Sequence, residues 1–268
     1  MPRHLLALCL APTGVFFAAF WLLPVVRLVG LPAEKGWETY FVVLTNSRYL
    51  TSLLQTLALS LGVTATTLAL GAAVGVFLAR HQFAGKRILL ALLTLPLSFP
   101  GVIVGFFVIL LGGRQGPIAQ WSQALGLGNW TFAYGLPGLF LAYLYFSLPR
   151  AIGTYTAAAQ SMDAGLEEAA RCLGASRWQV VRDVWLPQLA PTTMACAAMV
   201  FATAMGAFGT AFTLSAKFEV LPISIYNEFT NYANFALAAS LSIALGLMTW
   251  LVLFAARRFG TSNAVAAV

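Results

Sequence analysis

The chain has 268 residues, of which 60% are hydrophobic and only 9% are charged. Soluble domains carry about 25% charged residues, so this composition excludes a soluble globular protein and indicates an integral membrane protein. The formal net charge of +7 comes from basic residues scattered between apolar segments. They form no basic cluster interleaved with aromatic residues, so we do not expect nucleic-acid binding and relate them to membrane orientation instead.

Six apolar segments are predicted to span the membrane as helices, because a bilayer core about 30 Å thick requires about 20 apolar residues per helix. In chain order they cover residues 5–29, 51–79, 88–111, 136–160, 191–214 and 235–256. The first is longer than the apolar region of a cleaved signal peptide, so we expect it to be retained. Pro96 and Pro100 interrupt the third segment, and Pro149 lies midway along the fourth. Residues 1–268 are thus expected to form a single, all-α transmembrane domain.

Basic residues predict which way the chain crosses the membrane. If the N-terminus lies inside the cell, nine basic residues fall on the cytoplasmic side and five fall outside. Cytoplasmic loops are enriched in Lys and Arg, so both termini are expected to be cytoplasmic. The cytoplasmic set is Arg3, Arg80, Lys86, Arg87, Arg171, Arg177, Arg182, Arg257 and Arg258.

Two pairs of glycines, each four residues apart, lie within the second and third predicted spans. They are Gly71 with Gly75 and Gly101 with Gly105. Small residues at this spacing allow two helices in a membrane to approach closely. We interpret all four as packing positions and not as a site.

Residues 161–187 are too polar to span the membrane and are predicted to form two short helices at the cytoplasmic surface. Asp163 is placed to cap the first helix, whose early turns carry Glu167 and Glu168 near the positive end of the helix dipole. Gly174 is expected to end this helix, at the position where a left-handed residue is common.

The second helix of this segment is predicted to begin at Ser176, which forms a capping box with Gln179. Leu186-Pro187 is expected to close it just before the fifth span. Two interpretations are left open by the residues themselves: an amphipathic connector that rests on lipid headgroups, or a docking surface for a cytoplasmic partner. An apolar stripe on the second helix consists of Trp178, Val181, Val184 and Trp185.

The same segment resembles the signature of a known family. Glu168-Ala169-Ala170, three residues, Gly174, nine residues and then Val184-Trp185-Leu186-Pro187 is similar to the "EAA" signature of the permease subunits of binding-protein-dependent ABC importers. Residues 79–118 also resemble this family. Among its groups, the chain looks most like the spermidine/putrescine and ferric-iron permeases.

This resemblance implies a permease of the type I importer kind, with six transmembrane helices and a cytoplasmic helix-turn-helix that sits in a cleft of a separate ATPase. The implied partners are a dimer of ATP-binding subunits, an external solute-binding protein and a second permease, with a heterodimer favoured over a homodimer. The implied location is the lipid bilayer of the bacterial inner membrane. By resemblance, the ATPase-coupling residues are Glu168, Ala169, Ala170, Gly174, Ala175, Leu186 and Pro187.

Within that contact, the resemblance implies that Ala169 and Gly174 are small enough to allow close approach. Glu168 is expected to hold the loop through an ion pair or backbone hydrogen bonds. Arg171, three residues further on, is either its ion-pair partner or a solvated charge. Glu167 is interpreted as incidental to the match.

No catalytic chemistry is predicted on this chain. The sequence has no G-x-x-x-x-G-K-[S/T] phosphate loop, no metal-ligand cluster and no pairing of a nucleophile with a base. Cys9, Cys172 and Cys196 are not at the spacings of a disulfide framework or a metal site. We therefore expect a transport subunit and not an enzyme, with no cofactor of its own and with ATP and Mg²⁺ on the partner ATPase.

One charged residue, Arg150, lies inside a predicted span. An arginine at such a depth is costly and normally faces the bundle interior or water, so Arg150 is a candidate pathway or gate residue. A structural role, in which Arg150 binds backbone carbonyls, stays open. Its neighbours suit a constriction and are included as pathway candidates: Tyr143, Tyr145, Phe146 and Pro149.

The sequence says less about the substrate. The predicted spans contain no Asp or Glu, so they offer a polyamine no fixed anionic site, and Arg150 favours an anionic or anion-chelated substrate. Polyamine, iron and a small anion remain open. The alternative function is an ion-coupled secondary transporter, which predicts paired ionisable groups at mid-membrane, whereas only Arg150 is found there. A structural or assembly protein leaves the EAA spacing unexplained.

Overall fold

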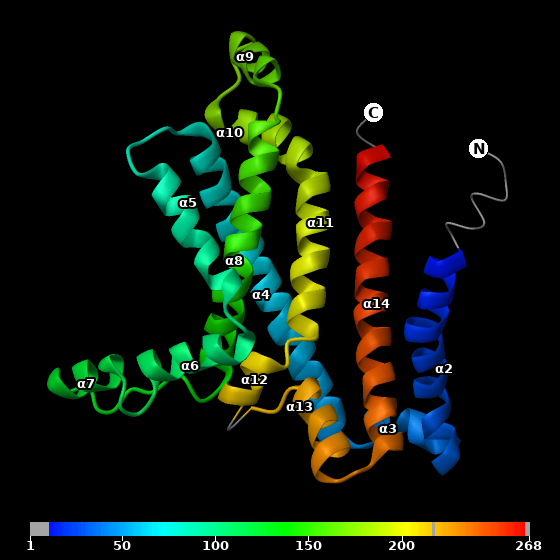
Figure 1. Ribbon diagram of the computed structural model, residues 1–268. Coiled ribbons are helices and arrows are strands. Elements are labelled where there is room, and N and C mark those ends of the chain that lie inside the picture. The colour runs from blue at the N-terminus through cyan, green and yellow to red at the C-terminus, as the bar shows by residue number, and fades with distance from the viewer. Residues whose placement is uncertain (1–10, 216–217, 266–268) are drawn as a thin grey trace. The chain divides into compact units, whose positions relative to one another are not determined.

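The computed structural model describes residues 11–215 and 218–265, with side chains up to residue 258, and this part of the chain is helical (Figure 1). The chain forms two compact units. One contains Met1–Leu53 and Leu221–Leu247, and the other contains Leu54–Val220 and Met248–Val268. The expectation of one domain over residues 1–268 stays a prediction.

Within the described residues, five helices are long and apolar enough to cross a membrane. They are Ala11–Lys35, Ser47–Arg80, Gly101–Ala124, Arg177–Met205 and Phe235–Arg258. The prediction of an all-helical membrane protein is therefore confirmed. The first, second and last predicted spans each coincide with one of these helices, although residues 5–10 of the first lie outside the described part.

The third predicted span, residues 88–111, is interrupted near Pro100 as expected, but its bounds are wrong, because the helix long enough to cross a membrane is Gly101–Ala124. α5 (Lys86–Thr94) runs into the 3₁₀-helix η4 (Leu95–Ser98), and α6 (Gly101–Gly112) begins after a break. Phe99 is extended, with φ −95° and ψ 134°, because the ring of the following Pro100 disfavours helical backbone there. Figure 1 shows α6 turning sideways from α5 toward α7 (Pro117–Ala124).

The fourth predicted span has the predicted bounds as a helix, α8 (Leu136–Gln160). Its 25 residues are about 37 Å long at 1.5 Å per residue, but it is not among the five apolar helices. α8 lies at the centre of the second unit, where it contacts α5, α6, α11 and α12. A helix covered by other helices needs less apolar surface than one facing lipid. A sixth span therefore remains a proposal.

The two predicted glycine pairs lie where helices pack closely, as their spacing predicted. A Cβ added at Gly71 or Gly75 of α4 (Ser47–Arg80) would lie 2.8 Å from the Cβ of Ala151 or 2.6 Å from that of Tyr155, both on α8. A Cβ on Gly101 of α6 would lie 2.8 Å from Oγ1 of Thr210, and one on Gly105 would clash with Thr213. α6 thus packs directly on α12 (Gly209–Leu214).

The fifth predicted span, residues 191–214, is wrong at both ends. A continuous helix covers Arg177–Met205 and comprises α10 (Arg177–Val180), the π-helix η5 (Val181–Trp185) and α11 (Leu186–Met205). Leu186-Pro187 does not close it. The N–H of Leu186 bonds the carbonyl of Val181, five residues back, and this π-turn carries the helix past a proline that lacks an N–H. α11 then ends at Met205, and α12 begins at Gly209.

The first unit joins the beginning of the described chain to the segment before the last helix. It contains η1 (Ala18–Leu22), α2 (Leu23–Gly30), η2 (Leu31–Lys35), η3 (Trp37–Phe41), α3 (Val42–Thr45), α13 (Leu221–Tyr226), η6 (Asn227–Asn231) and the first turns of α4 and α14 (Phe235–Val265). The hydroxyl of Tyr49 donates to Oε1 of the buried Glu228 at 2.7 Å, and Nζ of Lys35 donates to Oδ1 of Asn234 at 2.8 Å.

Candidate functional site

Residues 163–180, within the segment predicted to lie at the cytoplasmic surface, fold locally as their sequence predicts. Oδ1 of Asp163 accepts from the N–H of Gly165 at 2.8 Å and caps α9 (Ala164–Cys172). Gly174 follows with φ +84°, and the N–H of Ala175 returns to the carbonyl of Ala170 at 3.0 Å, which closes the helix end. Ser176 and Gln179 form the predicted capping box of α10. Two short helices, α9 and α10, therefore lie within residues 161–187 as predicted, whereas the cytoplasmic location and coupling role of this segment stay predictions.

A cluster of charged and aromatic side chains holds α9 to the rest of the second unit. Glu167 is buried, with Oε2 2.8 Å from Nη1 of Arg80 and Oε1 2.7 Å from Nη2 of Arg171. Nε1 of Trp185 donates to the same Oε2 at 3.1 Å, and the Arg80 guanidinium lies 5.0 Å from the Trp185 ring centre. One carboxylate thereby joins the end of α4, α9 and η5.

This arrangement corrects the interpretation of the two adjacent glutamates. The expectation that Glu168 forms the ion pair and that Glu167 is incidental is wrong for the contacts within the chain. Glu168 is exposed, and Arg171 pairs with Glu167. The signal was in the sequence, because Glu167 and Arg171 are four residues apart on one helix face. Arg80 and Trp185 come to Glu167 only through folding.

Most of the remaining predicted coupling residues are accessible. Ala169, Gly174, Leu186 and Pro187 are exposed, and Ala170 and Ala175 are half-buried. Large apolar side chains near them are also exposed: Leu166 at 52%, Leu173 at 90% and Trp178 at 70%. Trp178 was expected in the apolar stripe of the second helix. α9 and α10 thus present small and apolar surface away from the Glu167 cluster.

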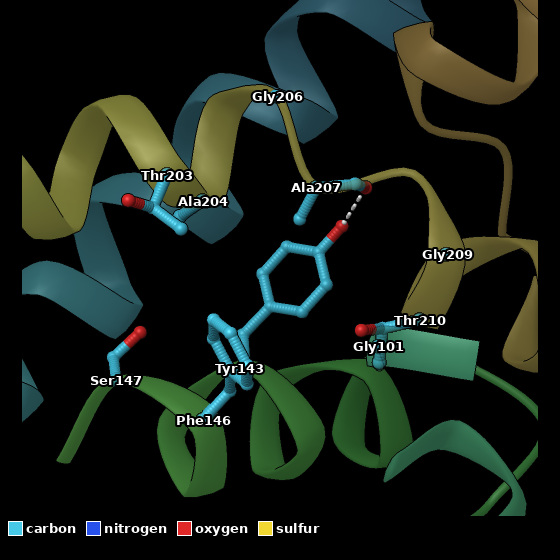
Figure 2. A pocket seen from close by; sticks show the side chains of 10 residues that line it. All are labelled: Gly101, Tyr143, Phe146, Ser147, Thr203, Ala204, Gly206, Ala207, Gly209 and Thr210. Carbon is cyan, nitrogen blue, oxygen red and sulfur yellow. Dashed lines mark hydrogen bonds between the residues drawn. The ribbon is translucent and has the colours of Figure 1, made fainter. Parts of the chain in front are cut away.

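A pocket of about 200 Å³ lies within the second unit, against the middle of α8 (Figure 2). It brings together two of the predicted pathway residues, Tyr143 and Phe146. The Tyr143 hydroxyl donates to the carbonyl of Ala207 at 2.7 Å, across to the turn between α11 and α12. The lining residues are Gly101, Tyr143, Phe146, Ser147, Thr203, Ala204, Gly206, Ala207, Gly209 and Thr210.

The other three predicted pathway residues do not line this pocket. The Arg150 guanidinium lies 5.8 Å from the Phe146 ring centre, on the same helix. Its side chain makes no ion pair or hydrogen bond with any of the described residues, so the structure does not support binding to backbone carbonyls. Tyr145 lines a separate apolar groove beside α6, and Pro149 is buried.

Sequence reasoning missed the hydroxyl groups of the pocket. Ser147 lies four residues after Tyr143 and so shares its helix face, a spacing that was available to find it. Thr203 lies on α11 and Thr210 lies on α12, on opposite sides of the helix interruption at residues 206–208. Their approach to α8 depends on where α11 ends, which the sequence interpretation placed nine residues too late.

Residues 11–215 and 218–265 contain no group of three or more His, Cys, Asp or Glu side chains that could hold a metal ion. Cys172 is exposed and Cys196 is buried, both as free thiols. The third cysteine, Cys9, lies outside the described residues.

Comparison with known proteins identifies the family. The profile described as "Binding-protein-dependent transport system inner membrane component" matches residues 71–262. The chain is 29% identical over 237 residues to the sulfate transport system permease protein CysW of Synechocystis sp., covering 87% of this chain and 85% of that protein. It is 32% identical over 212 residues to the molybdenum transport system permease protein ModB of Escherichia coli, covering 74% and 90%.

Solved structures agree on the fold. The chain superposes with a TM-score of 0.85 on a chain of a bacterial alginate ABC transporter, crystallised in complex with an alginate pentasaccharide-bound periplasmic protein. The match covers 97% of this chain and 95% of that chain at 19% sequence identity. With the family profile matched over most of its length, the chain belongs to the binding-protein-dependent transport system inner membrane components, the permease subunits of ABC importers.

Proposed function

We propose that this permease carries a small oxyanion of the sulfate or molybdate kind across the inner membrane. The observation that carries the proposal is the charge of its helices. α4, α6, α8, α11 and α14 contain no Asp or Glu, and the charged residue within α8 is Arg150. An arginine in a membrane helix interior favours anionic ligands.

The family to which the chain belongs defines what kind of subunit it is. The chain is a multi-pass inner-membrane permease and not itself an enzyme. It works in an importer complex with ATPase subunits and a binding protein, and ATP is bound by the ATPase. The conformational change that accompanies ATP hydrolysis on the ATPase must therefore be transmitted to this chain through a contact between the two subunits.

The relatives support the choice of substrate. Sulfate and molybdenum permeases are similar to this chain over most of its length, and this similarity does not point specifically to the polyamine or iron permeases. A polyamine is a cation and needs carboxylates along its path, which these helices lack. The proposal therefore replaces the spermidine/putrescine and iron grouping.

We propose residues 161–187 as the coupling segment that docks on the ATPase. Beside exposed charges such as Arg182, its surface presents small and apolar residues that suit close docking, with Leu173 90% exposed next to the left-handed Gly174. The Glu167 cluster holds the other side of α9 to α4 and η5. The residues proposed to contact the ATPase are Glu168, Ala169, Ala170, Gly174, Ala175, Leu186 and Pro187.

The membrane topology and the second permease also belong to this proposal. α8 is proposed as a sixth crossing, because its 25 residues suffice in length. An even number of crossings places both termini on one side, and the excess of basic residues assigns that side to the cytoplasm. A second, different permease is proposed to complete the pathway.

The test is transport by the complete complex in proteoliposomes, with the second permease, the ATPase and the binding protein. We expect ATP-dependent accumulation of labelled sulfate or molybdate, and none of spermidine. Uptake of spermidine or iron without oxyanion uptake would refute the substrate assignment.

The same vesicles separate an ABC importer from the alternative, an ion-coupled secondary transporter. An ABC importer needs ATP and the loaded binding protein, and it is unaffected when ionophores abolish proton and sodium gradients. Uptake driven by such a gradient in the absence of ATP would favour the alternative.

A further inference from the structure

The pocket beside Tyr143 lies where two helices of the second unit are interrupted. One break, at Phe99 and Pro100, precedes α6, and the other, at residues 206–208, separates α11 from α12. In a membrane, non-helical backbone is tolerated where it is buried in protein or lines a polar cavity. Two such breaks facing the middle of α8 therefore mark this pocket as a place for a ligand.

Two hydroxyl groups in the pocket have no partner. Ser147 is 6% exposed and Thr210 is 5% exposed, and the side chain of neither makes a hydrogen bond or other polar contact with a described residue. Figure 2 shows both oxygens directed into the space around the Tyr143 ring. Neither oxygen is among the described side-chain atoms that are fully enclosed without a partner, so both hydroxyls are accessible from the pocket and can bind something that enters it.

Several carbonyls at the pocket already accept a hydrogen bond. The Ala207 carbonyl accepts from Tyr143, and the Ala202 and Ala204 carbonyls accept from the N–H groups of Gly206 and Ala207 at 3.2 and 3.3 Å. Thr203 donates its hydroxyl to the Met199 carbonyl at 2.7 Å. The two hydroxyls without a partner are therefore available to donate hydrogen bonds to a ligand.

The start of α6 adds positive potential at the pocket. Gly101 lines the pocket at the first position of this 12-residue helix. The N–H groups of Ile103 and Val104 bond the Pro100 carbonyl, while the first amides of a helix have no partner within it. A helix N-terminus carries about half a positive charge and favours anions.

We propose that this pocket is a transit site in which Ser147 and Thr210 donate hydrogen bonds to a tetrahedral oxyanion. The inference rests on the proposed function, which supplies the substrate class. The volume of about 200 Å³ corresponds to about six waters at roughly 30 Å³ each, which accommodates a four-oxygen anion that retains part of its hydration. Hydroxyl donors without a cation among the lining residues suit a site that must release its ligand, because conduction requires weak binding.

The test uses the complete complex in proteoliposomes and compares Ser147→Ala, Thr210→Val and the double variant with the wild type. Sulfate or molybdate uptake and ATP hydrolysis stimulated by the loaded binding protein are measured together. We expect each single variant to lose about tenfold in uptake, the equivalent of one hydrogen bond to a charged group, and the double variant about a hundredfold, with stimulated hydrolysis within about twofold of the wild type.

Two matched variants test whether the free hydroxyls are responsible. Thr64→Val removes a buried hydroxyl of α4 that is bonded to the Ser60 carbonyl at 2.7 Å and does not line the pocket, and it should leave uptake near the wild-type rate. Ser147→Thr keeps a hydroxyl and should restore uptake relative to Ser147→Ala. The pocket inference is overturned if the double variant takes up oxyanions normally, or if uptake and hydrolysis fall together. A wild-type complex that imports no oxyanion refutes the proposed function instead.

Discussion

Oε2 of Glu167 lies 2.8 Å from Nη1 of Arg80, so that the last residue of α4 is tied to α9. Trp185 binds the same oxygen and stacks near Arg80, which adds η5 to the contact. A displacement of α9 by a docked ATPase would therefore reach α4 and, through η5, α11. This cluster is the physical link between the proposed docking surface and the transmembrane helices.

Glu167→Gln is expected to release α9 from α4. The substitution keeps the shape of the side chain but removes the charge that pairs with Arg80 and Arg171, and hydrogen bonds to charged groups contribute about 1.5–3 kcal/mol. If the free energy of local opening of α9 falls by about 2 kcal/mol, its amide hydrogens should exchange about thirtyfold faster. Hydrogen exchange over residues 164–172, with stimulated ATP hydrolysis in parallel, measures the effect.

The control for this prediction is Asp183→Asn. Asp183 is 62% exposed and lies 3.6 Å from the exposed Arg182, and surface pairs of this kind contribute about 0–1 kcal/mol. The amide exchange of residues 164–172 and the stimulated ATP hydrolysis of the Asp183→Asn variant should match those of the wild type. Equal effects from both substitutions would show that charge in this region matters in general and that the Glu167 cluster has no special role.

Gly174→Ala is expected to strain the turn between α9 and α10. Gly174 has φ +84°, and no atom lies within 4 Å of an added Cβ, so the cost is in the backbone and not in packing. A left-handed residue with a side chain costs about 1–2 kcal/mol, and asparagine tolerates this conformation better than alanine. Stimulated ATP hydrolysis should therefore decrease in the order glycine, asparagine, alanine. An alanine variant as active as the wild type would contradict the strain argument.

Gly75→Ala should separate α4 from α8, because the added Cβ would lie 2.6 Å from that of Tyr155. Overpacking of this kind costs about 1–3 kcal/mol. Gly153→Ala is the matched control, since nothing lies within 4 Å of its Cβ, and alanine is favoured over glycine in a helix by about 1 kcal/mol. Thermal unfolding of the purified complex should show a lower midpoint for Gly75→Ala and an unchanged or higher one for Gly153→Ala.

Arg150→Ala is expected to slow oxyanion uptake by about tenfold, because it removes the charge within α8 that favours an anion. Arg150→Lys should retain part of the rate, since it keeps the charge but not the planar guanidinium beside Phe146. Arg114→Ala, at an exposed position between α6 and α7, is the control. Unchanged sulfate and molybdate uptake by Arg150→Ala would exclude a direct role in the pathway.

The sequence predicted best where the chain interacts with itself over a few residues. Asp163, Gly174 and the Ser176 capping box act within one helical turn, and their positions were correct. The predicted bounds of the helices around α5 and α11 were wrong, because proline breaks the helix near α5 but not at the start of α11. Pro100 breaks the helix, whereas Pro187 lies in the first turn of α11 after a π-turn has changed the hydrogen-bond pattern.

By itself, the sequence determined that this is a helical membrane permease driven by a separate ATPase. Composition, apolar periodicity and the EAA spacing are properties of local segments, which a linear pattern records. Only the tertiary structure decided that Glu167 and not Glu168 holds α9, and that Ser147 and Thr210 face one pocket. These facts depend on side chains from helices far apart in the chain, and close approach at Gly75 and Gly101 decides which of them meet.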